Sequence, residues 1–440
     1  MNTSLKKSLS YVIRGGVATS AMDTLALGPT LIAYAKLLGA GNITFGILNS
    51  IPYFGNLMHF FVVWLFKKGH SARKISLVSS FASRPFYFLI ALLAFCSHSN
   101  AALPLLILFL TASYLIGCIS GGCWMPWMKE LVPENIIGRF FSARFRYMQI
   151  AKILCFLFAA GFLKYIKEYH PQAEIYAYSA LFFFAFIIGI YGAYTFIHVE
   201  NKSIPVNADI PLFRQFSLSL RNKPFCRLLL CLSLLNFGFA FITPFITVFM
   251  LNRLNISISN ILIFTLTSQI SYVFVIKKLG RISDRLGCDK ILIYELITML
   301  FILAILIAVN YFAAAHQTLT IATMWILHII LGLTTAAYTL GINNSSLLYI
   351  SHESSAVYLT VNSVLKSFAG AVGSLIAGPF LSLCLLFGNH NHFLSDTPSA
   401  DGWLIFFITG ILLTIGGLFC VKYYLDTDPR HRPSNKEKPS

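Results

Sequence analysis

Long apolar stretches, each separated from the next by a short polar turn, constrain this chain more than any other feature of its sequence. A helix that crosses a bilayer needs about 20 apolar residues, and the chain of 440 residues holds twelve such stretches. They lie at about residues 10–38, 43–66, 75–96, 103–128, 140–163, 175–198, 224–251, 257–276, 290–311, 318–350, 355–387 and 403–425. The sequence therefore predicts an all-α integral membrane protein of twelve transmembrane helices, with no room for a large soluble domain.

The charge content points the same way. Only 11% of the residues are charged, whereas a soluble domain carries roughly 25%. The net charge of +17 would suggest a nucleic-acid partner in a soluble protein, but here the cations lie in turns between apolar stretches. Such turns are attracted to anionic lipid headgroups. We therefore expect a lipid bilayer as partner, and no nucleic acid.

The basic residues are distributed unevenly between the two sides of the predicted membrane. One side has only Lys36, Lys164, Lys167 and Arg253. The other side has Lys6, Lys7, Lys67, Lys68, Arg73, Lys74, Lys129, Arg139, Lys202, Arg214, Arg221, Lys223, Lys277, Lys278, Arg281, Arg285 and Lys290. Cytoplasmic turns carry an excess of Lys and Arg, so we expect both termini to be cytoplasmic, in a bacterial inner membrane.

A polar stretch in the middle of the chain separates two groups of six apolar stretches. Residues 201–222 contain Pro205 and Pro211 together with basic residues, a composition typical of a linker. We predict an N-terminal six-helix bundle at 1–200, a cytoplasmic linker at 201–222 and a C-terminal six-helix bundle at 223–425. Residues 426–440 are polar and of mixed charge, so we predict a disordered cytoplasmic tail.

The turn after the eighth apolar stretch has a distinctive spacing, Gly280-x-x-x-Asp284-Arg285-x-Gly287-x-x-Lys290. The two glycines permit a positive φ, which predicts a tight turn. The Asp284 carboxylate can accept hydrogen bonds at the N-terminus of a neighbouring helix, where the helix dipole favours an anion. We interpret Gly280, Asp284, Arg285 and Gly287 as a conformational-switch loop; the alternative is an ordinary basic turn.

A second turn, after the fourth stretch, contains Pro133, Gly138 and Arg139. Pro133 cannot continue the preceding helix, and Gly138 permits a tight start to the next one. Arg139 can extend its guanidinium to the headgroups. The sequence thus predicts a short, conformationally defined connection between helices four and five.

The G-x-x-x-D-R-x-G-x-x-K and P-x-x-x-x-G-R spacings, with twelve spans and a central linker, resemble the major facilitator superfamily of secondary transporters. The resemblance implies two six-helix bundles that carry a small-molecule substrate by alternating access, as a monomer and without a cofactor. One departure is clear, because the equivalent turn of the first half, Lys67-Lys68-Gly69-His70-Ser71, has no carboxylate. A latch in the first half therefore lacks its acidic residue.

Asp23 lies near the middle of the first predicted helix, just before Gly28 and Pro29, which can break that helix. Ionisable residues at this depth are costly and by default functional. The resemblance places the first helix on the central cavity. We therefore interpret Asp23 as a proton-binding or substrate-contacting residue, with a structural ion pair as the alternative.

Several basic residues also lie inside predicted helices. Lys366 is deep in the eleventh helix and could bind an anion or pair with Asp23, while Arg144 could contact substrate or extend to the headgroups. Arg84 and Lys152 are further candidates, Arg84 on a helix expected at the periphery. Because buried cations outnumber buried carboxylates, we expect an anionic or zwitterionic substrate.

Neutral and acidic polar residues complete the candidates. Asn236, Asn343 and Asn362 could line the same cavity, although amides inside a membrane often serve as bonds between helices. We expect Glu295 to join the charges around Asp284, and Trp124 and Trp127 to lie in an interfacial aromatic belt.

Other functional classes lack their motifs. There is no Walker A sequence, so transport is expected to be proton-coupled symport or antiport, or passive. His390 and His392 lack a third ligand at fixed spacing, so no metal is expected. A membrane-embedded transferase would need clustered catalytic residues that are absent from the sequence. A non-transporting sensor or scaffold on the same fold remains the other alternative.

Overall fold

The computed structural model describes residues 3–97, 99–133, 137–201, 220–286, 288–313, 315–347, 355–390 and 398–427. The first set of helices comprises α1 (Thr3–Ala26), α2 (Pro29–Leu37), α3 (Asn42–Gly55), α4 (His59–Lys67), α5 (Ala72–Ser83), α6 (Pro85–Leu92), α7 (Ala102–Leu131), α8 (Ile137–Tyr169) and α9 (Glu174–Thr195). The second set comprises α11 (Lys223–Asn252), α12 (Ile258–Leu286), α13 (Cys288–Phe312), α14 (Gln317–Leu347), α15 (Ser355–His390) and α16 (Pro398–Thr427).

Ten segments of the described chain are long and apolar enough to cross a membrane. The first two crossings are interrupted. Gly28 has a φ of 60° and Pro29 begins α2, so the predicted break after Asp23 is present. The second crossing changes from α3 through a 3-10 turn at Asn56–Met58 into α4. Together these account for the twelve predicted helices, and the all-α membrane fold is confirmed.

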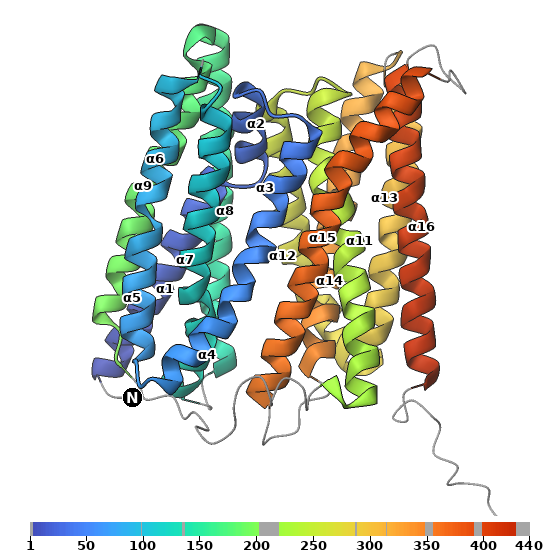
Figure 1. The fold of residues 1–440 in the computed structure, drawn as a ribbon. Helices are drawn as coiled ribbons and strands as arrows, with labels where there is room; N and C mark the ends of the chain where they lie inside the picture. The colour runs from blue at the N-terminus through green and yellow to red at the C-terminus, as the bar shows by residue number, and fades with distance from the viewer. Residues whose placement is uncertain are drawn as a thin grey trace, which may run out of the picture.

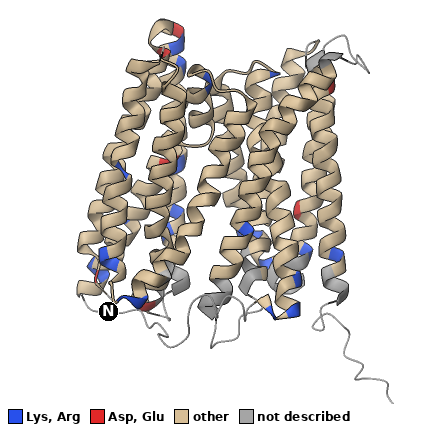
Figure 2. Ribbon diagram, viewed as in Figure 1, with Lys and Arg blue, Asp and Glu red and all other residues tan. Residues whose placement is uncertain are grey.

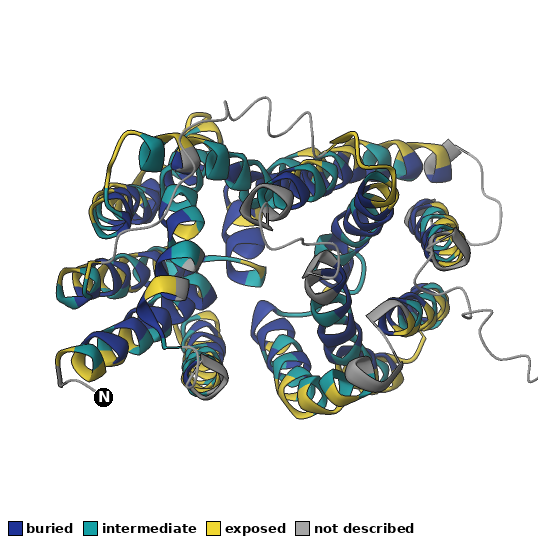
Figure 3. Ribbon diagram, turned by 90° about the horizontal axis from the view of Figure 1, so that it is seen from below, coloured by how far each residue is buried: buried dark blue, intermediate teal, exposed yellow. Residues whose placement is uncertain are grey.

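The two sets of helices lie side by side (Figure 1). Viewed along the helices, exposed residues lie mostly on the outward faces (Figure 3). Apolar side chains such as Phe274 and Phe419 are 74% and 71% exposed, as expected for side chains that face lipid. The largest apolar core contains residues of both sets, including Phe45 and Ala377, and α3 packs against α15 across the boundary.

The described chain begins and ends at the same end of the molecule, which we call the terminal face; the other end is the opposite face. Lys and Arg gather toward the terminal face (Figure 2). Lys67 and Lys68 end α4 there, and Arg73 and Lys74 begin α5. The uneven distribution of cations predicted from the sequence therefore has a clear counterpart in space.

The two sets are in closest contact on the side of the opposite face. A Cβ atom at Gly46 of α3 would lie 2.7 Å from the carbonyl oxygen of Ser374 in α15. A Cβ atom at Gly378 would overlap the carbonyl oxygen of Asn42. Lys36 also donates a hydrogen bond from Nζ to the Leu251 carbonyl oxygen, at 3.1 Å. The ribbons of the two sets separate toward the terminal face (Figure 1).

Two predicted turns are helical in the structure. Helix α12 continues to Leu286 and α13 starts at Cys288, so Gly280 lies inside a helix and the prediction of a turn with positive φ there was wrong. The residues after Gly280 include Ile282 and Leu286, whose spacing of four favours one continuous helical face. Similarly, α8 extends to Tyr169, beyond its predicted end near Leu163.

Several predictions fall outside the described residues. They concern most of the linker at 201–222, most of the tail at 426–440, and Gly287. The side chains of Asp284, Arg285, Arg139 and Asn343 are also not described. Pro133 follows Leu131, where α7 ends, and Gly138 is in the first turn of α8, in agreement with the connection predicted there.

Candidate functional site

Asp23 lies at the centre of a polar cluster within the first set of helices. Arg84, between α5 and α6, and Lys152 of α8 are the cations whose charges act on it. Tyr87 of α6 and Tyr114 of α7 lie in the same electrostatic neighbourhood. The charges that act on the Asp23 carboxylate are therefore those of Arg84 and Lys152 rather than that of Lys366.

Arg84 is directed into the first set rather than toward lipid. It lies at the junction where Pro85 starts α6. A Cβ atom at Gly189 of α9 would lie 2.9 Å from Arg84 Cδ and 2.7 Å from Met22 Sδ of α1. The glycine thus leaves room for the arginine stem to pass between α1 and α9. The helix that carries Arg84 packs against α7 and α9 of the first set, and the arginine side chain points inward from it.

Arg144 of α8 packs against α1 and α7. Its guanidinium lies over the Trp124 ring, 4.2 Å from the centroid, within the range of a cation–π interaction. A Cβ atom at Gly16 would lie 2.8 Å from two of its nitrogen atoms. Arg144 Nε is buried and has no hydrogen-bond partner among the described residues. Arg144 thus packs between α1, α7 and its own helix α8.

The two tryptophans of α7 do not form the predicted interfacial belt. Trp127 is fully buried, and its Nε1 donates a hydrogen bond to the Glu200 carbonyl oxygen at 3.0 Å. Trp124 lies beneath Arg144. Both side chains therefore hold the terminal face of the first set together, which sequence position alone could not distinguish from an interfacial location.

A second polar group joins three helices of the second set. Asn236 of α11 donates a hydrogen bond from Nδ2 to the Lys366 carbonyl oxygen of α15, at 2.6 Å. Tyr338 of α14 donates its hydroxyl proton to Asn236 Oδ1. The Tyr338 ring also stacks on Phe239 of α11, with centroids 3.9 Å apart. Asn236 thus fixes the backbone of α15 at the position of Lys366.

A bridge between the sets connects these two polar regions. Asn56 donates a hydrogen bond from Nδ2 to Ser367 Oγ of α15, at 3.1 Å. Cys118 of α7 contacts Asn56 Oδ1 through its thiol, at 3.9 Å, and its charge environment includes Asp23. A line of polar groups therefore runs from Cys118 through Asn56 and Ser367 to the helix that carries Lys366.

Tyr53 lies beside this bridge. A Cβ atom at Gly370 of α15 would lie 2.8 Å from the Tyr53 ring and would overlap Asn236 Nδ2. Gly370 therefore lets the two sets meet where their polar residues gather. Sequence reasoning missed Tyr53, Tyr338 and Cys118, because aromatic and thiol side chains within an apolar helix resemble ordinary core residues.

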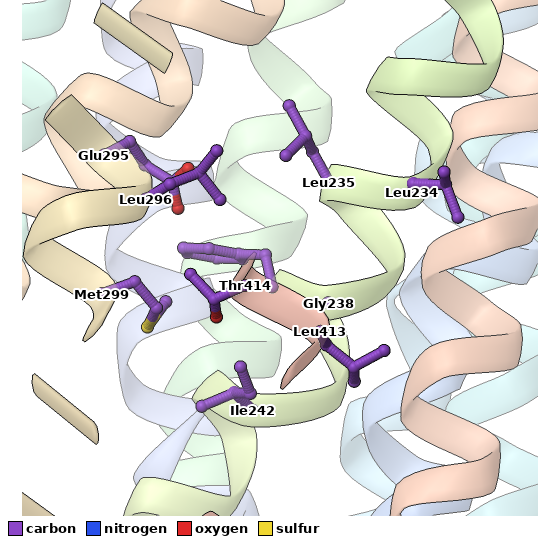
Figure 4. A pocket seen from close by; sticks show the side chains of 10 residues that line it. Leu234, Leu235, Gly238, Ile242, Glu295, Leu296, Met299, Leu413 and Thr414 are labelled. Atoms are coloured by element: carbon purple, nitrogen blue, oxygen red, sulfur yellow. The ribbon is translucent and has the colours of Figure 1, made fainter. Parts of the chain in front are cut away.

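The sequence predicted that Glu295 joins the charges around Asp284, whose side chain is not described; in the structure, Glu295 lies on the wall of a mainly apolar pocket. It is 2% exposed and lines a pocket between α11, α13 and α16 (Figure 4). The pocket is walled mainly by Leu234, Leu235 and Ile242 of α11, Leu296 and Met299 of α13, and Leu413 of α16. Helix α13 begins only two turns earlier, but the side chain faces inward from that helix.

Asn362, Asn343 and Lys366 are the remaining candidates from the sequence. Asn362 of α15 is buried, at 4% exposed, whereas the side chain of Asn343 is not described. Lys366 is partly buried. Of the candidates from the sequence, the structure thus brings together Asn236 and the backbone of Lys366, and it places Asp23 in a separate cluster on the other side of the boundary.

The fold and its buried polar residues define a polytopic helical membrane protein of two packed sets of helices. The chain belongs to the Major Facilitator Superfamily, whose sequence model matches residues 15–374. This confirms the family suggested by the two turn spacings. A comparison with curated proteins found no significant match.

Solved structures of transporters share the fold across nearly the whole chain. An auto-inhibited POT family peptide transporter has a TM-score of 0.70 at 10% identity, covering 98% of this chain and 99% of its own. A bacterial homologue of the human lysosomal transporter Spinster, inward-facing and occupied, has a TM-score of 0.69 at 13% identity, with 97% of both chains covered. A variant of the nucleoside transporter NupG has a TM-score of 0.67 at 15% identity, covering 94% and 99%.

The family and these neighbours indicate that the chain is a membrane transporter of a solute rather than an enzyme. At identities of 10–15% the likeness concerns the fold, and the solutes of these neighbours do not transfer to this chain.

Proposed function

We propose that the protein carries a small anionic or zwitterionic solute across the membrane by alternating access between its two sets of helices. The observation that carries the proposal is the excess of cations in and around the polar line across the boundary. The charges of Arg84 and Lys152 act on the carboxylate of Asp23, and Lys366 lies on α15 of the other set. Unpaired cations away from bulk water favour a carboxylate or phosphate as partner.

Asp23 fits a substrate-contacting role better than that of an isolated proton carrier. The charges of Arg84 and Lys152 act on this carboxyl group, so that the three side chains can serve as one charged site. Together the three charges could bind both the carboxylate and the ammonium group of a zwitterion. Alternatively, Arg84 and Lys152 could bind an anion. Asn236, Asn362 and the hydroxyl of Tyr338 offer neutral polar contacts from the second set.

The contact between Gly46 and Gly378 supports a state closed at the opposite face. We infer that the terminal face is cytoplasmic, because cations gather there (Figure 2) and cytoplasmic turns are enriched in Lys and Arg. The described structure would then be an inward-facing state of a monomer, with the two sets rocking about the polar line.

Uptake by proteoliposomes tests the proposal. Purified protein is reconstituted and supplied with mixtures of labelled carboxylates, phosphate esters and amino acids, with and without a pH gradient. We expect accumulation of an anionic or zwitterionic solute. Transport restricted to cationic or uncharged solutes would contradict the substrate class, and absence of any transport across the panel would contradict the proposed function.

Lys152 and Lys164 provide a matched pair of variants on α8. Lys152 acts on Asp23, whereas Lys164 is exposed on the same helix. We expect Lys152→Met and Lys366→Met each to lower the rate of uptake at least about tenfold, equivalent to about 1.4 kcal/mol. Lys164→Met should leave uptake unchanged. Equal uptake by all three variants, at equal protein levels, would remove these lysines from the site.

A further inference from the structure

Glu295 is a buried acid in surroundings that cannot stabilise its charge. Its Oε2 atom is buried and has no hydrogen-bond partner among the residues that the structure describes. No basic side chain in those residues lines the pocket that holds it. An ionised carboxylate without a partner is strongly disfavoured in an apolar interior.

Two hydroxyl groups in its neighbourhood, those of Thr414 and Tyr338, already donate their protons to other acceptors. Thr414, the other residue with a side-chain oxygen on the pocket wall, donates its hydroxyl proton to the Gly410 carbonyl oxygen at 2.8 Å. Tyr338, whose environment includes the charge of Glu295, donates to Asn236. A hydroxyl has only one proton to donate, so both groups can accept from a neutral carboxyl but cannot solvate a carboxylate.

The described residues of the helices packed around Glu295 place no second acidic or basic side chain in its pocket. The pocket residues of α11 and α16 are apolar apart from Thr414. On α14 the titratable neighbour is Tyr338. On α12, Lys277 and Lys278 are exposed. In the described state, the pocket therefore suits the protonated, neutral form of Glu295.

Helix α11 connects Glu295 to the polar line between the two sets of helices. Leu234, Leu235 and Gly238 of α11 form one side of the pocket, while Asn236 projects from another side of α11 and binds the backbone of α15. The next residue on the pocket wall, Phe239, stacks on Tyr338. Movement of α11 as solute binds near Asn236 would thus change the surroundings of Glu295.

We propose that Glu295 is the proton-binding residue of this transporter, away from the solute site and coupled to it through α11. The assignment rests on the proposed transport function. The carboxyl O–H bond is intact in the described state. When α11 and α16 separate and admit water, that bond breaks, the proton passes to water and the carboxylate is left hydrated.

Infrared titration of the full-length protein in lipid nanodiscs tests proton binding directly, with no solute present. Raising the pH should remove the C=O stretching band of a protonated carboxyl from the wild-type spectrum. We expect Glu295→Gln to lack this change, and Asp23→Asn to retain it, as should Glu168→Gln, which alters an exposed acid. An unchanged band in Glu295→Gln would overturn the assignment, as would loss of the band on adding Na⁺ or K⁺ at fixed pH.

Glu295→Asp covers the case in which the glutamine variant does not fold. It keeps an acid but withdraws it by one methylene, so the pH midpoint of the band should shift; an unshifted midpoint would place the titrating acid elsewhere.

Transport by the variant separates failure of this inference from failure of the proposed function. With the solute found by the uptake screen, Glu295→Gln should retain solute exchange across equal concentrations. Its accumulation under a pH gradient should fall to the level seen without the gradient. Accumulation equal to that of the wild type would overturn proton binding by Glu295, whereas wild-type protein inactive toward every solute would overturn the function and leave the infrared result standing.

Discussion

Tyr338 combines two interactions in one side chain. Its hydroxyl donates to Asn236, and its ring stacks on Phe239 with an interplanar angle of 9°. The amide of Asn236 is then oriented with Nδ2 toward the Lys366 carbonyl oxygen. Removing the hydroxyl would therefore disturb the amide without removing the aromatic packing.

Tyr338→Phe isolates the contribution of this hydrogen bond to stability. We expect the free energy of unfolding to fall by about 1 kcal/mol, because hydrogen bonds between membrane helices contribute about 0.6–1.7 kcal/mol. Thermal unfolding in detergent, followed by tryptophan fluorescence, measures the change. Tyr191→Phe is the control, since Tyr191 is exposed; identical melting of the two variants would show that the bond does not stabilise the fold.

Residue identity alone predicted which buried groups carry charge, but not their neighbours. Asp23 and Lys366 were recognised as deep ionisable residues, and the structure places both away from full exposure. Their proposed pairing was not found, because α8 and the junction of α5 and α6 bring Lys152 and Arg84 to Asp23 instead. Which helices adjoin depends on packing between residues far apart in the chain.

At the scale of elements, glycines decide how closely helices approach. Gly46, Gly370 and Gly378 all lie on the contact between α3 and α15. Small residues allow close helix packing within membranes, where dispersion and hydrogen bonds replace the hydrophobic effect as the attractive force. The contact can therefore form and open without exposing polar backbone to lipid.

Gly378→Ala should open this contact. The added methyl group would meet the Asn42 carbonyl oxygen, a backbone atom that cannot move aside, so we expect the closed opposite face to be destabilised. A membrane-impermeant maleimide applied from that face should then label Cys118 several times faster than in the wild type, as quantified by peptide mass spectrometry.

Gly161→Ala provides the control for this substitution, because a Cβ atom at Gly161 of α8 would meet no atom of another helix within 4 Å. Labelling of Cys118 at the wild-type rate in the Gly378 variant would show that the α3–α15 contact does not close the opposite face.

At the scale of the whole molecule, hydrogen bonds join the helices of each set at one end of that set. In the first set, the backbone N–H of Glu200 donates to Ser8 Oγ at 2.9 Å, and Trp127 donates to its carbonyl oxygen. In the second set, Arg253 donates from Nε to Asn310 Oδ1 at 3.1 Å, and Asn310 donates to the Ala400 carbonyl oxygen at 2.7 Å. The hydrogen bonds of the first set lie at the terminal face, and those of the second set lie at the opposite face.

The hydrogen bonds around Glu200 offer an explanation for the absence of an acidic residue from the turn at Lys67–Ser71. Arg73, which follows that turn, donates to the Ile197 carbonyl oxygen at 2.5 Å, just before Glu200. The 3-10 turn after α9, at Phe196–His198, thus supplies an acceptor for the start of α5 in place of a carboxylate within the turn. The sequence could not reveal this, because the partners are 124 residues apart.

The orientation of the molecule can be measured with a peptide tag after the last residue. If the terminal face is cytoplasmic, protease should remove the tag from inside-out membrane vesicles and leave it intact in right-side-out vesicles. The cations at that face, which resist translocation, are the physical reason. Removal of the tag from right-side-out vesicles alone would reverse the proposed orientation and the inward-facing assignment.

The sequence by itself determined the number of membrane crossings, the break at Gly28 and Pro29, the end of α7 before Pro133 and the family. These features depend on hydropathy, on backbone geometry and on short spacings, all of which are local. Only the tertiary structure decided that Glu295 lies in an apolar pocket, that Arg84 and Arg144 are directed inward, and that Asn56 meets Ser367. These features depend on which helix faces line up, and in a chain apolar on nearly every face the hydropathy pattern does not specify that alignment.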